Sequence, residues 1–546
     1  MFKYFALYLT LGVLVVNGIY VIKPGPKVPP TKGEVWPKPQ FEKKDIYYYS
    51  FNPARFVTEK RTLNYTCDIL TSAVTRYSYV IKWSNNINRL NRRRNTPNIV
   101  QGPHYDTYYR GRLRSLEIYL MSPCEHHPYF GMDESLGIKA KLSSNSIWGI
   151  LRGLETFSQL AYINDDGTEV RINRTHIADF PRYSHRGLML DTSRHYLTVT
   201  TIKRMIDAMA TNKLNVFHWH IVDDQSFPYQ SQVFPELCRK GAYSYPTMIY
   251  TREDIALIIE YATERGIRVI PEFDVPGHTA SWGVAYPNIL AECYSGGKVL
   301  GLGPMNPINN ATYAILSELI KEVQTWFPDQ YFHIGGDEVE LECWESNPAL
   351  QKYMKAHNMS SSQLHGLFME NVIPLLGSKA KPIVWQEVFD EGVPLSRGTL
   401  IQVWKWDWVN EMIKILRSGH RLIFSSSWYL DHLSSGGDWV DFYKADPREM
   451  VSAKAGNNTF LDNIVGGEAC MWGEVVDDSN AMTRVWPRAS AVAERLWSPP
   501  MDKVSHEDQI SDASTRLEEH ACRMLRRGIK AQPPNGPGYC LGAPSI

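Results

Sequence analysis

The chain has 546 residues, 43% of them hydrophobic, and its 58 lysines and arginines are balanced by 58 aspartates and glutamates. This length provides for two or three domains of ordinary globular composition, which excludes a single small module. Because the net charge is zero and Arg92-Arg93-Arg94 is the main basic run, we expect no nucleic-acid partner.

The N-terminus has the parts of a secretory signal peptide. Met1-Phe2-Lys3 is followed by an apolar run to about Val16 and then by Asn17-Gly18, so residues 1–18 are predicted to be removed on export. Because apolar residues resume at Ile19–Ile22, an uncleaved membrane anchor of marginal length is the alternative. No later segment of the sequence is apolar for long enough to span a bilayer.

Further features of the sequence favour export. Five Asn-X-Ser/Thr sequons predict N-glycosylation, at Asn64, Asn173, Asn310, Asn358 and Asn457. Eight cysteines allow disulfides in an exported chain, and their spacing shows neither the cysteine pairs of a zinc ribbon nor a dense knottin pattern. We therefore expect a protein of the secretory pathway, located in the lysosome or outside the cell.

Residues 19–180 are expected to form a smaller α+β domain that begins with a proline-rich lead, Pro24–Pro39. Leu113–Leu120 partly alternates in hydrophobicity, as a half-buried strand does, and Ser146–Phe157 has helical spacing. No chemistry is assigned to this domain.

From Arg186 onward, short apolar strands alternate with amphipathic helices, a pattern that indicates parallel strands with helical connections. Eight strands are predicted, at 188–190, 216–219, 268–270, 331–334, 383–385, 400–404, 422–424 and 464–471. Helices are predicted at 200–210, 251–265, 311–326, 361–376, 410–416 and 488–496. This order and size predict a TIM barrel over residues 181–500. Residues 501–546 are expected to be a helix, Ser505–Arg527, and a tail that pack on the barrel.

Functional side chains follow nearly every predicted strand. Active sites of TIM barrels lie at the C-terminal strand ends, so these residues are candidates for one shared site. Each residue alone could be an ordinary loop residue, but the shared location favours a function. In chain order they are Asp191, Arg194, His220, Asp223, Asp224, Glu272, Asp274, His278, Asp337, Glu338, Trp385, Glu387, Trp404, Tyr429, Asp431, Trp472 and Glu474.

The most informative string is His333-Ile334-Gly335-Gly336-Asp337-Glu338, in which two adjacent carboxylates follow a short apolar strand. Carboxyl groups that repel each other in a dry pocket have pKa values that are driven apart, so that one acid and one base lie side by side. A solvated Asp-Glu pair at a strand end is the alternative for the string taken alone.

Carboxylate, indole and imidazole groups at one barrel mouth suit the hydrolysis of a neutral sugar acetal, because the leaving oxygen needs a proton and the oxocarbenium charge needs stabilisation. Sequence neighbours such as Asp337 and Glu338 are poorly suited to flank one sugar ring from opposite faces. If the sugar bears a 2-acetamido group, its carbonyl oxygen can attack the anomeric carbon instead. One carboxyl then donates the proton while the other holds the amide.

The chain resembles family 20 glycoside hydrolases, the β-N-acetylhexosaminidases, and in particular the lysosomal hexosaminidase subunits of animals. Five strings carry the resemblance in the order expected for the predicted barrel, and it extends from about Trp36 almost to the C-terminus. The strings are Arg186–Tyr196, Phe217–Asp224, Glu272–His278, His333–Glu338 and Gly466–Glu474.

The resemblance implies a role for each candidate. Glu338 is the implied general acid and later base, and Asp337 orients the acetamido N–H and stabilises the cyclic cation. His278 and Asp223 form a relay behind Glu338. The implied substrate-binding residues are Arg194, Trp385, Trp404, Tyr429, Asp431, Trp472 and Glu474. Barrel packing is the alternative for each tryptophan, and we prefer a structural role for His218, His220 and His333.

Substrate preference is expected to depend on Asp431. In one of the two animal subunit types this position is Asp, which should repel a 6-sulfated sugar; in the other it is Asn followed by Arg. The chain has Asp431, so we expect a preference for neutral terminal N-acetylhexosamines, although an imidazolium at His432 could partly offset the repulsion. Ser435 occupies the position from which the neutral-type subunit sends a Tyr into its partner's site, which puts dimer-dependent completion of the site in doubt.

The resemblance also implies three disulfides, Cys67–Cys124, Cys293–Cys343 and Cys522–Cys540, with Cys238 and Cys470 as buried thiols. It implies a homodimer that acts on an oligosaccharide or glycoconjugate. No metal site or cofactor is expected, because the His and Asp residues lack a convincing ligand set. The alternatives are a hydrolase of chitin oligomers or N-glycans with the same site, and a sugar-binding protein that has lost turnover.

Overall fold

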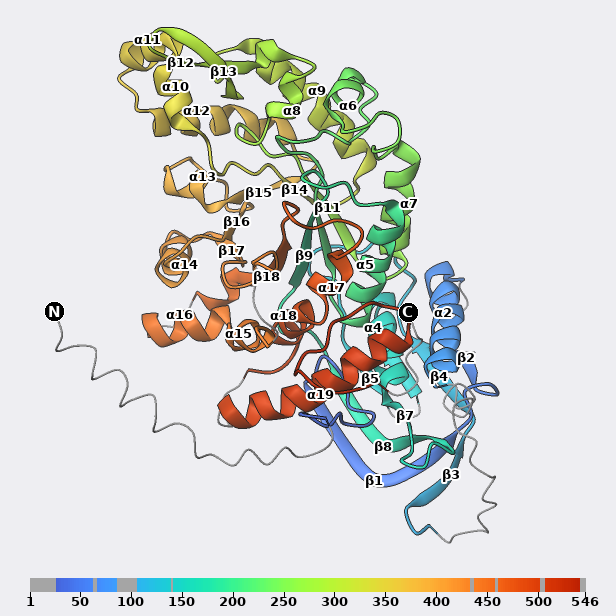
Figure 1. The fold of residues 1–546 in the computed structure, drawn as a ribbon. Helices are drawn as coiled ribbons and strands as arrows, with labels where there is room; N and C mark the ends of the chain where they lie inside the picture. Colours follow the sequence, from blue (N-terminus) through green and yellow to red (C-terminus); the bar gives the residue numbers. More distant parts are fainter. Residues whose placement is uncertain are drawn as a thin grey trace, which may run out of the picture.

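The computed structural model describes residues 26–61, 66–85, 106–138, 141–432, 437–456, 460–500 and 506–540. An eight-stranded closed barrel lies beside a second, mixed sheet, the N-terminal sheet, which also has eight strands (Figure 1). The predicted TIM barrel and the α+β domain before it are therefore confirmed. Among the residues that the structure describes, no helix is long and apolar enough to cross a membrane.

All eight predicted barrel strands are present, in the order β10-β11-β14-β15-β16-β17-β18-β9, and every neighbouring pair is parallel. Their apolar residues are buried on both faces, as helical connections require of a parallel sheet. The strands are β9 (His185–Asp191), β10 (Val216–His220), β11 (Arg268–Glu272), β14 (Tyr331–His333), β15 (Lys381–Trp385), β16 (Leu400–Val403), β17 (Arg421–Phe424) and β18 (Ile464–Met471).

The predicted helices surround the barrel with small shifts at their ends. Several begin at side-chain caps, such as Thr198, Thr251 and Ser360, whose oxygens accept backbone N–H groups of the first turn. The helices are α5 (Val199–Thr211), α7 (Arg252–Thr263), α9 (Asn310–Trp326), α12 (Ser361–Val372) with η2 (Ile373–Leu376), α14 (Trp408–Arg417) and α18 (Arg488–Trp497).

Shorter elements in the connections were not predicted, because three- to ten-residue helices and an inserted hairpin give little periodicity. They are α6 (Glu236–Gly241), α8 (Ala280–Gly283), η1 (Pro287–Ile289), β12 (Leu290–Ser295), β13 (Lys298–Met305), α10 (Leu341–Ser346), α11 (Pro348–His357), α13 (Gln386–Asp390), α15 (Trp439–Lys444), α16 (Pro447–Ala455), η3 (Leu461–Asn463) and α17 (Ala481–Val485). Most of them line the C-terminal end of the barrel.

The N-terminal sheet has the order β2-β4-β6-β5-β8-β1-β3, with β7 paired to β8. The segment predicted as one strand at Leu113–Leu120 is two strands, because β3 pairs with β1 while β4 pairs with β2 and β6 elsewhere in the sheet. The strands are β1 (Phe41–Phe51), β2 (Val57–Lys60), β3 (Tyr109–Leu113), β4 (Ser115–Leu120), β5 (Leu136–Ile138), β6 (Lys141–Ser144), β7 (Ala161–Ile163) and β8 (Val170–Asp179).

Helix α4 (Ile147–Leu160) packs on this sheet, and α2 (Asp68–Ser84) packs against α4 and shares one apolar cluster with the sheet. Every residue of α4 is buried. On its barrel side, Arg152 and Arg186 form ion pairs with the buried Glu134, and the Arg152 Nη2 also donates to Gly266 O at 2.8 Å. The sheet and the barrel are therefore joined by satisfied buried charges as well as by apolar contacts.

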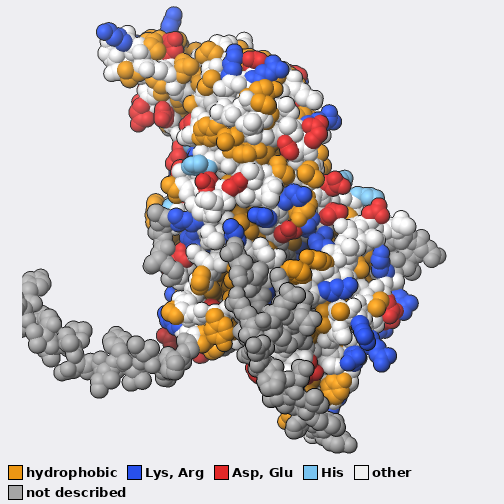
Figure 2. Space-filling view, turned by 45° about the vertical axis from the view of Figure 1, so that its right-hand side comes forward, with side chains coloured by type: hydrophobic (Ala, Val, Ile, Leu, Met, Phe, Trp, Pro, Cys, Tyr) orange, Lys and Arg blue, Asp and Glu red, His pale blue; other side chains and the backbone are white. Residues whose placement is uncertain are grey.

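The last helix, α19 (His506–Arg526), packs on the barrel near the N-terminal sheet (Figure 1). Arg516 pairs with the buried Glu494 of α18, and Arg527 after the helix pairs with Glu155 of α4. On the face shown in Figure 2, basic and acidic side chains are interspersed, in keeping with the zero net charge.

Candidate active site

His278, in the connection after β11, lies among the carboxylates that the sequence singled out. Its Nδ1 lies 3.2 Å from Asp223 Oδ1, and its Nε2 lies 3.7 Å from Asp337 Oδ2 and 3.8 Å from Glu338 Oε2. Burial disfavours the charged imidazole, but the hydrogen bond with Asp223 and the charges of Asp337 and Asp223 outweigh it and raise the pKa of His278 to about 9. An imidazolium therefore lies between Asp223 and the two carboxylates.

Two glycines shape the loop after β14 that carries Asp337 and Glu338. Gly335 and Gly336 have φ values of 71° and 96°, and a Cβ on Gly335 would lie 1.7 Å from Asp274 Oδ1. The Gly336 N–H donates to that oxygen at 2.8 Å. The chain can therefore turn tightly against Asp274, and Glu338 follows with a φ of 48°, which is uncommon for a residue with a side chain.

Asp337 and Glu338 occupy different environments although they are neighbours in sequence. Asp337 is 5% exposed, whereas the Glu338 side chain is 58% exposed. Asp337 also acts electrostatically on Glu387 and Tyr429. The buried carboxyl thus lies close to these two side chains, and the exposed one lies at the mouth.

A third carboxyl, Asp274, lies beside Asp337. Burial and the charge of Asp337 raise the pKa of Asp274 well above its ordinary value. The sequence argument considered only the mutual repulsion of Asp337 and Glu338; the structure adds Asp274, from the preceding connection, to that electrostatic group. Sequence distance concealed this contact, because it joins the ends of two different strands.

Asp223 connects His278 to the barrel interior. Its Oδ2 lies 2.7 Å from His220 Nε2 and 2.9 Å from Arg194 Nη2. Burial would raise the pKa of Asp223, but hydrogen bonds from His220 and His278 lower it overall. His220, for which the sequence favours a structural role, therefore stands directly behind the residues at the mouth.

Four aromatic side chains cluster beside Asp337 and are the candidate wall of a substrate pocket. Ring centroids are 6.4 Å apart for Trp385 and Trp404, 6.1 Å for Trp385 and Trp472, and 6.1 Å for Trp404 and Tyr429. Trp385 is fully buried, while the other three rings are partly buried and pack on the same cluster. Such indole and phenol faces match the apolar faces of a sugar or an acetamido methyl group.

Gln386, Glu387 and Lys405 hold this wall in place. The Gln386 Oε1 accepts from the backbone N–H groups of Trp404 and Lys405 at 3.0 and 2.9 Å, and the Trp404 indole donates to Glu387 Oε2 at 3.0 Å. Burial and the charge of Asp337 raise the pKa of Glu387 to about 7. Gln386 and Lys405 were missed by the sequence analysis, although each follows a predicted strand and the same strand-end criterion could have found them.

Arg194, Asp431 and Glu474 lie around the mouth. The Arg194 guanidinium pairs with Asp191 at 2.8 Å and lies 5.1 Å from the Trp472 ring centre. The charge of Glu474 acts on both Arg194 and Asp431, and burial raises the pKa of Asp431. These side chains offer both donors and acceptors for hydroxyl groups.

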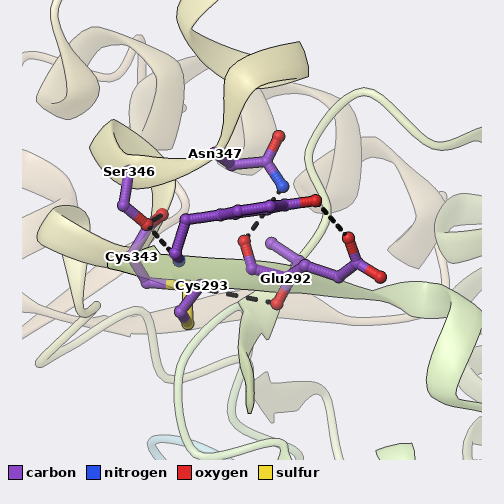
Figure 3. The surroundings of a disulfide bond; sticks show 7 residues. Glu292, Cys293, Cys343, Ser346 and Asn347 are labelled. Carbon is purple, nitrogen blue, oxygen red and sulfur yellow. Dashed lines mark hydrogen bonds between the residues drawn. A yellow bond between two sulfur atoms is a disulfide. The ribbon is translucent and has the colours of Figure 1, made fainter. Parts of the chain in front are cut away.

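The Cys293–Cys343 disulfide joins two connections of the site (Figure 3). Cys293 lies on β12, which follows His278, and Cys343 lies on α10, which begins three residues after Glu338. The Ser346 Oγ accepts from the Tyr294 N–H at 2.8 Å, and the Asn347 side chain donates to Glu292 O at 2.9 Å. The other disulfides are Cys67–Cys124 and Cys522–Cys540, and Cys238 and Cys470 are buried thiols, which is the pairing that the resemblance implies.

Some sequence predictions concern residues outside the described ranges: the signal segment, Asn64, Asn457 and Ser435. Among the described sequons, Asn310 and Asn358 are exposed, while the Asn173 Oδ1 accepts from the Tyr162 hydroxyl at 2.7 Å. Asn173 is therefore the least accessible of the three for modification.

Within the described residues, three groups bring His and acid atoms close enough to share a cation: His218-Glu272-His333, Asp223-Asp224-His278 and Asp274-His278-Asp337. In each group an imidazole lies beside the carboxylates as a counter-charge. We treat them as ion-pair clusters, and no step below uses a metal.

The raised pKa of His278 predicts a pH-dependent stability. Because the pKa is about 9 in the folded chain and 6.5 ordinarily, the protonated imidazole stabilises the fold fully below pH 6.5, and this stabilisation is lost as the pH rises through 9. Its upper bound is about 3 kcal/mol. Thermal unfolding of the wild type and His278→Asn should show a difference in Tm that shrinks between pH 6 and pH 10. A constant difference would contradict the prediction.

Comparison with protein families gives two matches. Residues 183–500 match the model of glycosyl hydrolase family 20, catalytic domain, and residues 35–160 match the model described as beta-acetyl hexosaminidase like.

Individual relatives cover most of the chain. It is 42% identical to beta-hexosaminidase subunit beta of Homo sapiens, with 95% of this chain and 90% of that protein covered. It is 48% identical to the Mus musculus subunit beta, with 78% and 79% covered. Among solved structures, the chitobiase of Flavobacterium johnsoniae superposes with a TM-score of 0.74 at 30% identity, covering 91% of this chain and 73% of that one.

Proposed function

Because the chain belongs to glycosyl hydrolase family 20 and is an exo-acting β-N-acetylhexosaminidase, we propose that it removes terminal GlcNAc or GalNAc with the acetamido oxygen of the sugar as the nucleophile. The observation that carries this proposal is the division of Asp337 and Glu338 between the buried surroundings of the aromatic cluster and an exposed mouth. Aromatic side chains of that kind suit an acetamido group, and a carboxyl at the mouth suits a leaving aglycone.

Glu338 is the proposed proton donor to the leaving oxygen. Its exposure leaves room for an aglycone, and the His278 imidazolium 3.8 Å away stabilises the carboxylate that remains after proton transfer. The same carboxylate then takes a proton from the water that opens the cyclic intermediate. Two inversions, one by the amide oxygen and one by water, give net retention at the anomeric carbon.

Asp337 is the proposed partner of the acetamido N–H. Holding that N–H turns the carbonyl oxygen toward the anomeric carbon, and the nearby negative charge stabilises the oxazolinium ion. Trp385, Trp404 and Trp472 would enclose the acetamido methyl and the sugar, and the Tyr429 hydroxyl would reach the acetamido oxygen. Arg194, Asp431 and Glu474 would bind the ring hydroxyls.

A panel of aryl hexosaminides tests the function. We expect cleavage of the β-linked N-acetylglucosaminide and N-acetylgalactosaminide, with the β-configured sugar as first product in an NMR time course. An α-configured first product would exclude the proposed double inversion. A sugar-binding protein without turnover would cleave none of the panel, and no observation favours that alternative or a chitin- or N-glycan-specific enzyme.

A preference for neutral over 6-sulfated substrates is expected. The partly buried Asp431 and the exposed Glu474 place negative charge beside the proposed sugar site. His432 is exposed, and its Nε2 lies 3.9 Å from Asp431 Oδ2, so its electrostatic effect on the sugar site is screened by solvent. We expect the ratio of kcat/KM for neutral to 6-sulfated aryl N-acetylglucosaminide to exceed one, and to fall in Asp431→Asn. Faster hydrolysis of the sulfated substrate by the wild type would contradict the preference.

We further propose the biological setting expected of such an enzyme: a glycosylated homodimer that enters the secretory pathway after loss of residues 1–18 and resides in the lysosome or outside the cell. The disulfides and the animal relatives support this location. We also propose the domain bounds 19–180, 181–500 and 501–546; two apolar clusters support the first boundary, although Trp36 of the lead packs with the barrel cluster.

A further inference from the structure

The interior of the barrel contains a layer of buried polar side chains directly beneath the site. One part of the interior is apolar, with Val216, Ile270, Tyr331, Ile383, Leu400, Ile423 and Val465 in one cluster. The polar layer consists of His185, His218, His333, Glu272, Glu468 and Gln402, each at most 2% exposed. TIM barrels are usually filled by branched apolar residues, and burying charges is costly unless they are paired, so this layer needs an explanation.

Glu272 is the residue where this layer meets the site. Its Oε2 accepts a hydrogen bond from His220 Nδ1 and lies 3.0 Å from His218 Nε2. Its Oε1 accepts from the Trp385 indole N–H at 2.9 Å and lies 3.1 Å from His333 Nδ1. The mechanism above uses His278 and Trp385 but gives no role to Glu272.

Strand register explains why one carboxylate reaches both groups. Glu272 is in register with His220 on one side and with His333 on the other. In-register residues of neighbouring parallel strands are adjacent and point to the same face of the sheet, so these three side chains enter the barrel interior side by side. Trp385 ends β15, one strand beyond β14.

From Glu272 two short chains of contacts lead to the two halves of the site. Through His220 and Asp223, at 2.7 and 3.2 Å, it reaches His278, the partner of Glu338. Through the Trp385 N–H it reaches the aromatic pocket, where Trp385 packs against Trp404 and Trp472. The side chains of Glu272, His220, Asp223 and Trp385, which make these contacts, are all buried.

We propose that Glu272 is a positioning residue that joins the acid half of the site to the acetamido pocket: one of its oxygens orients the His220-Asp223-His278 chain and the other orients the indole of Trp385. The inference rests on the proposed function, because it assumes that Glu338 is the acid and that Trp385 encloses the acetamido group. The new element is that Glu272 couples the acid half of the site to the acetamido pocket; a purely structural carboxylate would not serve both.

Glu468 provides a matched control in the same layer. It is also a buried carboxylate with several partners, His218 at 2.6 Å, His185 at 3.0 Å and Gln402 at 3.1 Å. It shares His218 with Glu272, but among the described residues it makes no hydrogen bond or ion pair with His220, Asp223 or Trp385. Gly187 makes room for it, because a Cβ there would lie 2.2 Å from Glu468 Oε2. Replacing Glu468 with Gln removes the same charge from the barrel core without touching either chain of contacts.

The experiment compares Glu272→Gln and Glu468→Gln in the full-length enzyme, with Tm as the measure of structural damage. The acid half is read from the ratio of kcat for an unactivated disaccharide to kcat for an aryl glycoside with a good leaving group. The pocket is read from the Ki of a thiazoline analogue of the cyclic intermediate. A Gln side chain can accept at one oxygen only, so two of the four contacts lose their acceptor.

For Glu272→Gln we expect the kcat ratio to fall and the Ki of the thiazoline to rise, each by about tenfold or more, the range typical of lost supporting contacts. Glu468→Gln, with a similar fall in Tm, should change neither quantity by more than about threefold. Equal effects of the two variants at matched Tm would show a structural role only. Movement of one readout alone would overturn the coupling. If Glu272→Gln does not fold, Trp385→Phe removes a single donor from the same oxygen; an unchanged leaving-group ratio would then overturn the proposal.

The activity of the wild type on the hexosaminide panel distinguishes an error in the inference about Glu272 from an error in the proposed function. If the wild type is active and Glu338→Gln is impaired while Glu272→Gln behaves like Glu468→Gln, the inference about Glu272 is wrong and the proposed function stands. If the wild type does not cleave the hexosaminide panel, the proposed function is wrong.

Discussion

A Glu338→Gln variant is expected to lose about a hundredfold or more in kcat toward oligosaccharides, because an amide cannot protonate the leaving oxygen. The loss should be smaller for aryl glycosides whose phenolate leaves without a proton. The exposed Glu338 side chain makes no contact that the fold requires among the described residues, so Tm should be nearly unchanged. Steady-state kinetics over a series of leaving groups measures the effect.

Glu340→Gln is the matched control for this variant. Glu340 is an exposed carboxylate two residues further along the same loop and lies before α10. The same chemical change there should leave kcat unaltered. If Glu338→Gln and Glu340→Gln have equal activity on an unactivated disaccharide, Glu338 is not the acid.

Asp337→Asn should lower kcat by a comparable factor, but this loss should depend on the substrate in a different way. The neutral amide cannot stabilise the positive oxazolinium ion, and removal of one such electrostatic contact costs about a hundredfold to a thousandfold in kcat. Because Asp337 is buried beside the aromatic pocket, the loss should persist even for aryl glycosides with good leaving groups. The leaving-group series therefore distinguishes it from Glu338→Gln.

A change of substrate provides the control for Asp337. The wild type should cleave the aryl N-acetylglucosaminide far faster than the corresponding glucoside, which lacks the acetamido group. In Asp337→Asn this preference should largely collapse, since the carboxylate acts on that group. A variant that is slower on both substrates by the same factor would show that Asp337 serves the fold or the ring and not the amide.

The barrel could be predicted because its strands carry their own signal. Strands buried on both faces, such as Val216–His220 and Ile464–Met471, are short, mainly apolar runs between helical patterns, and all eight were found within a few residues. The candidate site residues could be predicted from the strand ends, because parallel strands bring their C-terminal ends to one face. The short connection helices and the β12–β13 hairpin could not be predicted, since they depend on packing against the barrel.

By itself the sequence determined the barrel, the aromatic and acidic character of its mouth, and the family to which the chain belongs. Only the tertiary structure decided which carboxylates face one another: Asp274 beside Asp337, Asp223 against His220 and Arg194, and Glu272 between His220 and Trp385. Hydrophobic periodicity records which face of an element is buried, whereas electrostatic partnership depends on distances between elements that are far apart in the chain. For that reason the roles of charged groups in the barrel interior can be read from the folded chain alone.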